Sequence, residues 1–283
     1  MNPTLHAVRL GLARGWIETR HTLVSRQEIG FTVVTSAAMI VVMYFQRDAT
    51  LPGTSISLAA VTLPGVLGML AAFNGLLSAV GGLAVEREDG TLLRAKALPQ
   101  GMVGYLVGRI VLVSLTTLTR VLVVLVGGLV LIPSLAHTPP SGWLTMVWVL
   151  LLGLTATLPL GAVIGSLVTN PQTAAGLSML LTGGLAAVSG IFYPLSALAG
   201  WLQALAHVFP LYWLGLGMRS ALSPAGAAAE IGGSWHTLET IGVLGAWSVA
   251  GLLLAPPILR RMARRESGSL MQMRRDRALQ RIG

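Results

Sequence analysis

Long, nearly uninterrupted apolar blocks constrain this chain more than any other feature, because water cannot solvate them. An α-helix needs roughly 20 apolar residues to cross the hydrocarbon core of a bilayer. Six blocks meet or approach that length, at residues 29–45, 58–85, 105–133, 143–168, 174–193 and 240–259. Only 10% of the 283 residues are charged, against about 25% in soluble domains. The sequence therefore predicts an all-α membrane protein with six transmembrane helices in residues 29–259.

A seventh apolar stretch, residues 195–222, differs from these blocks because Gly200, Pro210 and Gly215 interrupt it. This pattern predicts two short helices. Backbone that leaves the helical conformation at membrane depth is tolerated only where protein covers it or water reaches it. We therefore expect residues 194–222 to form an extracytoplasmic re-entrant or interfacial helix pair before the last span.

Basic residues indicate the orientation of the chain, because cytoplasmic loops of membrane proteins are enriched in Lys and Arg. Four arginines precede the first block, and eight follow the last one within residues 260–283. Two of the remaining basic residues, Arg94 and Lys96, lie between the second and third blocks. We expect both termini to be cytoplasmic and the protein to lie in a bacterial inner membrane. Because the net charge of +9 sits beside apolar blocks, it indicates topology and not nucleic-acid binding.

The two ends of the chain are predicted to lie at the cytoplasmic face. Residues 1–28 favour an amphipathic interfacial helix, because one seam at helical spacing is apolar, while Leu10 and Ile17 lie on another face. A loose cytoplasmic leader is the alternative. Residues 260–283 form a basic tail whose arginines are suited to contact with anionic lipid headgroups. The apolar seam consists of Leu5, Val8, Leu12, Trp16 and Leu23.

The cytoplasmic segment 86–99 carries the most informative pattern in the chain. Three acidic residues come first, Gly90 breaks the run, and Pro99 ends a short predicted helix. The helix presents Leu92, Leu93 and Leu98 in a charged setting, which suits docking into a groove on a partner protein. A solvated loop whose charges only determine topology explains the residues equally well.

Two polar residues lie within predicted spans, where such residues are costly and often functional. Arg120 is about midway along the third block, and Asn74 is in the second. We assign both, as a hypothesis, to a translocation path. We expect no acidic partner for Arg120 at comparable depth, since Glu28 lies at the cytoplasmic edge of the first span. The alternatives are that Arg120 snorkels to a headgroup and that Asn74 makes a helix–helix hydrogen bond.

Two segments of the chain resemble those of a known family. The first closely resembles the E-R-E-x-G-T-L-x-R segment of type-2 ABC exporter permeases, and Pro99 also fits that pattern. The second resembles the family's extracytoplasmic re-entrant helix pair, and the Arg-rich style is similar to daunorubicin-resistance-type permeases. The first segment is Glu86, Arg87, Glu88, Asp89, Gly90, Thr91, Leu92, Leu93 and Arg94; the second includes Gly190, Tyr193, Pro194, Pro210 and Arg219.

The resemblance implies that residues 86–99 form a coupling helix that sits on a separate nucleotide-binding ATPase subunit, with the side chain of Glu86 in contact with that subunit. A second permease copy or paralogue would complete a homo- or heterodimer, and the path would run between the two. Lys96 is the only lysine and Ala97 follows it, so the chain lacks the Gly-x-x-x-x-Gly-Lys-Ser/Thr loop that binds nucleotide phosphates. We therefore expect no cofactor on this chain, with ATP and Mg²⁺ bound by the partner ATPase.

The resemblance also implies export of an amphipathic or hydrophobic substrate, such as a drug, a lipid or a lipid-linked glycan, and a link to multidrug or antibiotic resistance. A secondary transporter is the first alternative, but the spans lack the carboxylates that ion coupling uses. A non-transporting membrane assembly protein is the second. An intramembrane enzyme is disfavoured, since no cluster of nucleophiles, acids or histidines occurs at membrane depth.

Overall fold

The computed structural model describes residues 3–50, 57–88, 90–168, 171–189, 195, 198–223 and 233–265. These residues fold into α-helices joined by short connections, with one 3₁₀ turn (Pro133–His137) and one isolated β-bridge between Thr50 and Ser57. The helices are α1 (Pro3–Leu23), α2 (Arg26–Gln46), α3 (Leu58–Glu88), α4 (Thr91–Ala97), α5 (Gly101–Leu131), α6 (Pro140–Leu167), α7 (Pro171–Val188), α8 (Gly200–Val208), α9 (Pro210–Leu222) and α10 (Thr237–Arg265).

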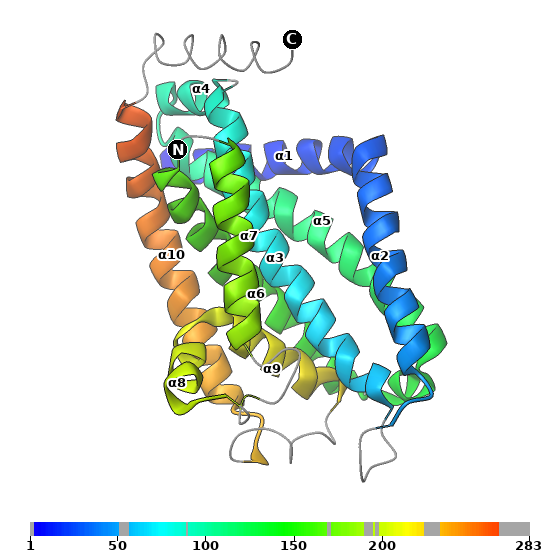
Figure 1. Ribbon diagram of the computed structural model, residues 1–283. Helices are drawn as coiled ribbons and strands as arrows, with labels where there is room; N and C mark the ends of the chain where they lie inside the picture. Colours follow the sequence, from blue (N-terminus) through cyan, green and yellow to red (C-terminus); the bar gives the residue numbers. More distant parts are fainter. Residues whose placement is uncertain are drawn as a thin grey trace.

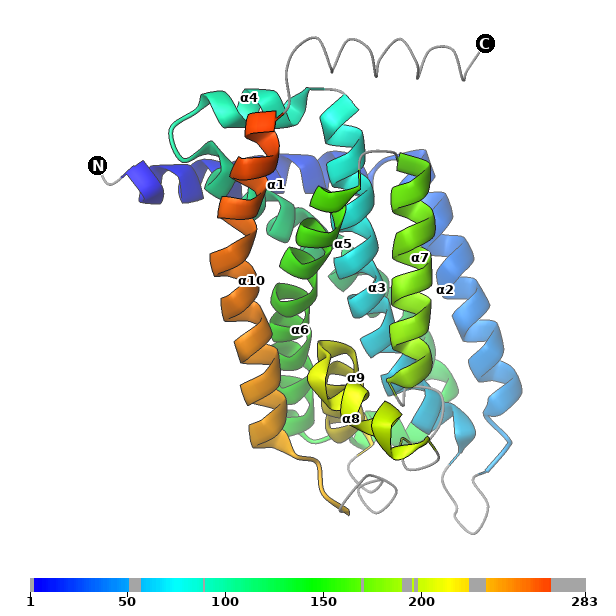
Figure 2. The ribbon, with the colours of Figure 1, turned by 60° about the vertical axis from the view of Figure 1, so that its left-hand side comes forward.

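The described helices confirm an all-α membrane architecture. Five of them, α2, α3, α5, α6 and α10, are long and apolar enough to cross a bilayer. Helix α7 runs beside α3 in the same bundle (Figure 2) but is not one of the five. The count of six spans therefore stays a prediction.

The last helix extends beyond the boundary that the sequence predicts. Helix α10 continues past residue 259 to Arg265 and contains Pro256 and Pro257. Ala255 and Leu259 flank the two prolines and are buried in the core. Packing on both sides thus holds the helix together where the prolines remove two backbone hydrogen bonds. The first residues of the predicted tail are consequently part of a helix.

Helix α1 lies across one end of the bundle, nearly perpendicular to the long helices (Figure 1). Its buried residues are small and recur every fourth position: Ala7, Gly11, Gly15 and Thr19. They pack on the start of α5, and a Cβ atom added to Gly15 would lie 2.6 Å from the carbonyl oxygen of Gly108. Small residues permit such close helix contact in membranes. This stripe of small residues was not among the features predicted from the sequence.

The two ends of the bundle differ. Helices α1 and α4 and the C-terminal end of α10 lie at one end, whereas α8 and α9 lie at the other (Figures 1 and 2). The stretch 195–222 contains the two short helices that its Gly and Pro residues predict. Helix α9 is buried along almost its whole length and packs against α3 and α6. Its membrane depth, and thus a re-entrant geometry, stays a prediction.

Candidate functional site: the groove between α1 and α4

A glycine in a left-handed conformation lies at the bend between the long helix α3 and the short helix α4. Gly90 adopts φ 76° and ψ 7° and precedes α4 as its N-cap residue. This left-handed conformation disfavours residues that carry a Cβ atom. The backbone N–H of Arg94 donates to the carbonyl of Gly90 at 3.2 Å, and the Arg94 guanidinium donates to Thr91 Oγ1 at 3.1 Å. The predicted bend and short helix are therefore both present.

The two faces of α4 have different roles. Leu92 is only 1% exposed and packs in the chain's own core with Leu83 and Met102. The expectation that Leu92 fills a groove on a partner is therefore wrong. Leu98, just after α4, is instead 62% exposed. Asp89 and the side chains of Arg87, Glu88 and Leu93 lie outside what the structure describes, so their assignment stays a prediction.

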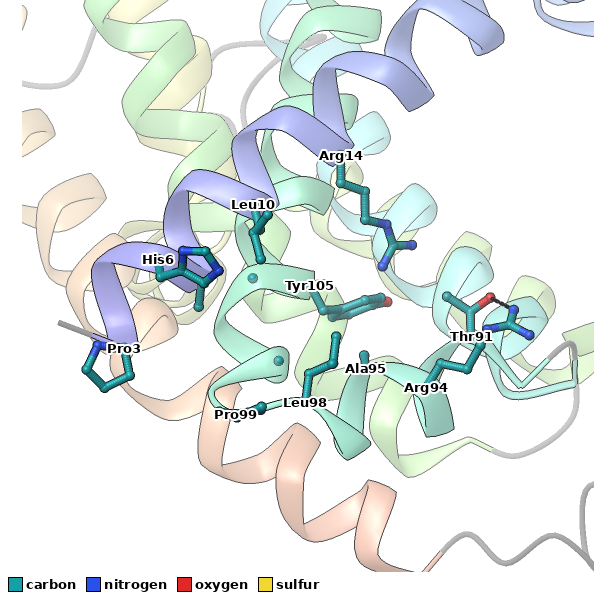
Figure 3. Close-up of a pocket in the computed structure, with 14 residues that line it drawn as sticks. Pro3, His6, Leu10, Arg14, Thr91, Arg94, Ala95, Leu98, Pro99 and Tyr105 are labelled. Carbon is teal, nitrogen blue, oxygen red and sulfur yellow. Dashed lines mark hydrogen bonds between the residues drawn. The ribbon is translucent and has the colours of Figure 1, made fainter. Parts of the chain in front are cut away.

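A groove of about 900 Å³ separates α1 from the segment that contains α4 (Figure 3). Helix α1 contributes His6, Leu10 and Arg14 to one wall, and Tyr105 of α5 lies between the walls. The lining is mainly apolar, with basic side chains among it. The opposite wall consists of Thr91, Arg94, Ala95, Leu98 and Pro99.

Glu86 lies beside this groove, beyond the apolar part of α3, which spans Leu58–Leu83. Its side chain is 12% exposed and points into the protein. Tyr105 Oη donates a 2.5 Å hydrogen bond to Glu86 Oε2, while Arg14 Nη2 and Arg109 Nη1 each lie 3.7 Å from Oε1. Burial raises the pKa of Glu86 above its ordinary value, and it outweighs the opposing effects of Arg109, Tyr105 and Arg14.

The inward position of Glu86 corrects the expectation that this side chain contacts an ATPase. Its carboxylate instead joins α3 to α1 and α5. In the sequence alone, Arg14 and Arg109 count only as indicators of topology. The available signal for Arg109 was its place within the apolar run of α5 (Gly101–Leu131), where a charged residue requires a partner.

Arg120 and Asn74 are brought together with a third residue, Glu28. Arg120 donates to Glu28 Oε1 from Nε at 3.0 Å and from Nη2 at 2.6 Å, and its Nη1 donates to Asn74 Oδ1. The expectation that no acid pairs with Arg120 is therefore wrong. Helix α5 runs obliquely across the bundle (Figure 1). The position of Arg120 along the sequence therefore does not give its depth in the bundle. A place for these residues on a translocation path stays a prediction.

The predicted re-entrant region is only partly described. Pro210 begins α9, and Arg219 is buried near its end. Trp213 Nε1 and Trp247 Nε1 donate to the carbonyls of His207 and Val208, both at 2.7 Å, which attaches α8 to α9 and α10. Gly190, Tyr193 and Pro194 lie outside the described residues.

Comparison with known families decides which class of membrane protein carries this groove. The model of the ABC-2 type transporter family matches residues 9–223, which is most of the chain. The chain belongs to the ABC-2 type transporter family. The ABC-2 match covers α4, the bend at Gly90 and the α8–α9 pair, and it identifies the chain as a type-2 ABC transporter permease. No curated protein matches the chain significantly.

An ABC-2 permease is a transmembrane subunit and generally not the ATPase. This agrees with the lack of a phosphate-binding loop in the sequence. The family match and the apolar helices together make the chain a multi-pass membrane protein.

Proposed function

We propose that this chain is the permease subunit of an ATP-driven exporter and that its separate ATPase subunit docks at the groove between α1 and α4. The observation that carries the proposal is the groove itself, which has apolar walls and lies beside the bend at Gly90. A groove with exposed apolar side chains is typical of helix-in-groove recognition. Motion of the docked ATPase would reach the spans through α4.

The exposed apolar residues of α1 fall on two faces, which supports two different contacts. Leu5, Leu12 and Trp16 lie on the face turned away from the groove, where they suit the lipid interface. Leu10 and Ile17, seven residues apart and thus on one side of the helix, are 54% and 56% exposed. Leu10 lines the groove. Apolar side chains on the groove side of an interfacial helix favour a protein partner.

The end of the bundle that carries α1 and α4 is the cytoplasmic end in this proposal. The arginines of α1, α4 and the C-terminal part of α10 gather there, as the positive-inside rule requires. Both termini are then cytoplasmic in a bacterial inner membrane, α7 completes six spans, and α8 and α9 form a re-entrant pair on the outer side. ATP and Mg²⁺ bind to the ATPase and not to this chain.

Two permease subunits, identical or paralogous, would associate with two ATPases, and a path between the permeases would open alternately to each side. The charges of Arg120 and Glu28 compensate each other, so this pair adds no net charge to the bundle. This supports an amphipathic or hydrophobic substrate, such as a drug, a lipid or a lipid-linked glycan, and is compatible with a role in drug resistance.

The carboxylates of the described spans disfavour a secondary transporter, because of where they lie and what they pair with. Glu28 and Glu239 lie near helix ends, and each has a basic partner: Glu28 pairs with Arg120, and Glu239 lies 3.3 Å from His236 Nδ1. Ion-coupled transport uses carboxylates that are open to the coupling ion at membrane depth.

Co-purification of the ATPase tests the docking site. The variant Leu10→Ser/Leu98→Ser removes apolar contact from both walls of the groove, and Leu238→Ser is the matched control, because Leu238 is exposed at the opposite end of the bundle. An affinity-tagged permease is co-expressed with a separate ATPase that carries a phosphate-binding loop. We expect the double variant to retain much less ATPase than the parent and the control. Equal retention in all three would refute the docking site.

A further inference from the structure

We propose that Glu86 and Arg109 form a joint that transfers the movement of α4 to α1 and α5, so that Glu86 positions the permease helices and does not bind the ATPase. This joint rests on the proposed function and adds to it the route by which movement leaves the docking site.

The contacts of Glu86 place this joint where three helices meet. Glu86 lies near the end of α3, shortly before the bend at Gly90. Its carboxylate accepts a hydrogen bond from Tyr105 and pairs with Arg109 of α5 and with Arg14 of α1. Helix α4 follows the end of α3 through the bend at Gly90 and packs on α3 as well as on α5. A displacement of α4 therefore also acts on the end of α3. Because Glu86 has partners on both other helices, it carries that displacement to each of them.

Arg109 is fitted closely against α3. Its Nη2 donates to the carbonyl oxygen of Ser78 at 2.6 Å, and its Nη1 faces Glu86. The guanidinium occupies the space that a side chain at position 82 would take, since a Cβ atom added to Gly82 would overlap it. Side chains on a helix point back toward its N-terminus, so the carboxylate of Glu86 reaches back toward this space. The lack of a side chain at Gly82 therefore leaves the space that the Arg109 guanidinium occupies.

The stability of the fold does not account for this arrangement. A buried ion pair contributes little net stability, because desolvation offsets the attraction between the charges. Burial indeed raises the pKa of Glu86 despite two arginines and a tyrosine hydroxyl nearby. What the cluster does supply is a fixed position of α5 against α3, since the hydrogen bonds of Tyr105 to Glu86 and of Arg109 to Ser78 are charge-assisted and directional. The ion pair with Arg14 adds α1 to this arrangement.

The helices that meet at Glu86 are also suited to move together. Gly15 of α1 packs directly on the backbone of Gly108 in α5, and such close contact leaves no room for independent sliding. Farther along α5, Arg120 pairs with Glu28 of α2. A movement received at Glu86 thus reaches α1, α5 and then α2 through contacts that the structure contains.

The test measures movement at the far end of the bundle. Two spin labels are attached to Val130→Cys in α5 and Leu238→Cys in α10, both exposed, in a chain with no cysteine of its own. The complete complex with its ATPase is reconstituted in lipid, and the distance between the labels is measured with and without ATP. Glu86→Gln is compared with Glu86→Asp, which keeps the charge, and with Glu239→Gln, an exposed carboxylate at the opposite end.

We expect ATP to change the label distance in the parent, in Glu86→Asp and in Glu239→Gln. In Glu86→Gln the change should fall to about half or less, since charge-assisted hydrogen bonds are roughly twice as strong as neutral ones, while the ATPase still co-purifies and hydrolyses ATP. A full distance change in Glu86→Gln overturns the joint and leaves the proposed function intact. Loss of ATPase binding in Glu86→Gln alone also overturns it, because Glu86 would then act in docking. Failure of the parent to bind an ATPase would contradict both the proposed function and the joint.

Discussion

Arg120 of α5 and Glu28 of α2 form an ion pair in which Arg120 Nη2 lies 2.6 Å from Glu28 Oε1. The two side chains are 12% and 16% exposed. Few residues of α2 are buried: in the described helix these are Ser36 and Met43. The pair therefore adds a polar link to the apolar packing of Met39, Ile40 and Met43 on the core. Asn74 of α3 joins this link by accepting a hydrogen bond from Arg120.

Breaking this pair on one side should destabilise the protein. Arg120→Met leaves the carboxylate of Glu28 in a poorly solvated place without its partner, which costs roughly 3 kcal/mol for a buried pair. The double variant Glu28→Met/Arg120→Met removes both charges and should recover most of the loss. Thermal unfolding in detergent measures both. If the double variant is as unstable as the single one, the ion pair is not the cause.

The glycine contact between α1 and α5 should not tolerate a methyl group. In Gly15→Ala the new Cβ atom would lie 2.6 Å from the Gly108 carbonyl oxygen and 2.7 Å from Val111 Cβ. We expect a loss of about 1–3 kcal/mol from overpacking. Gly30→Ala is the matched control, because the added Cβ atom would meet nothing within 4 Å apart from its own stretch of helix, and it should gain up to about 1 kcal/mol from helix propensity. Melting temperatures that fall equally in both variants would contradict the contact.

The bend before α4 should require a residue that accepts a positive φ. Gly90→Pro forces φ to about −65°, whereas Gly90 adopts 76°, so α4 should lose its place and the ATPase should no longer co-purify. Gly90→Asn is the control, since asparagine tolerates the left-handed region better than other residues. Immunoblots of membranes check that both variants accumulate. Normal ATPase retention by Gly90→Pro would show that the bend is not needed for docking.

The raised pKa of Glu86 predicts a pH dependence of stability. For a group whose pKa is higher in the folded state, its stabilising contribution is complete below the unfolded value, here 4.5, and is lost as the pH rises through the folded value. The parent should therefore lose stability relative to Glu86→Gln as the pH rises from about 4.5 toward neutrality. The groups that face Glu86 are Arg14, Glu18, Tyr105 and Arg109. Melting curves in detergent at several pH values measure the difference, and a constant difference would contradict the burial effect.

Thiol labelling should establish the orientation. Because the chain contains no cysteine, single-cysteine variants give an unambiguous signal. Leu98→Cys and Trp201→Cys replace exposed side chains at opposite ends of the bundle. A membrane-impermeant reagent should label Trp201→Cys in intact cells and Leu98→Cys only after the membrane is opened. Labelling of Leu98→Cys in intact cells would place the groove beyond the reach of a cytoplasmic ATPase.

Several elements of the fold were predictable because their causes are local. The apolar runs that became α2, α3, α5, α6 and α10 were recognisable from length alone, since bilayer thickness sets the number of residues required. The break before α4 was equally clear, because Gly90 is followed by a helix-forming run and then by Pro99. The interruption at Pro210 likewise predicted two short helices in place of one span.

The site was less predictable, because the sequence does not say which face of a helix meets a neighbour. Leu92 and Leu98 have the same chemistry, yet one is buried and the other is exposed. On α1, the apolar seam that includes Trp16 predicts the amphipathic helix, but its large side chains are exposed. The residues that hold the helix to α5 are small ones such as Gly15. Small residues give no hydrophobic signal, although they allow the closest packing.

The amino-acid sequence by itself determined that this chain is an all-helical membrane protein with a bend at Gly90, because apolar run length and the sign of φ depend on nearby residues only. The tertiary structure alone decided that Glu86 turns inward to Arg109 and that Arg120 meets Glu28. Each pair joins two different helices, and Arg120 and Glu28 are 92 positions apart in the chain. The tilt of α5 determines which of these charges share a depth. Electrostatic pairing in a low-dielectric interior depends on such distances, which no linear pattern records.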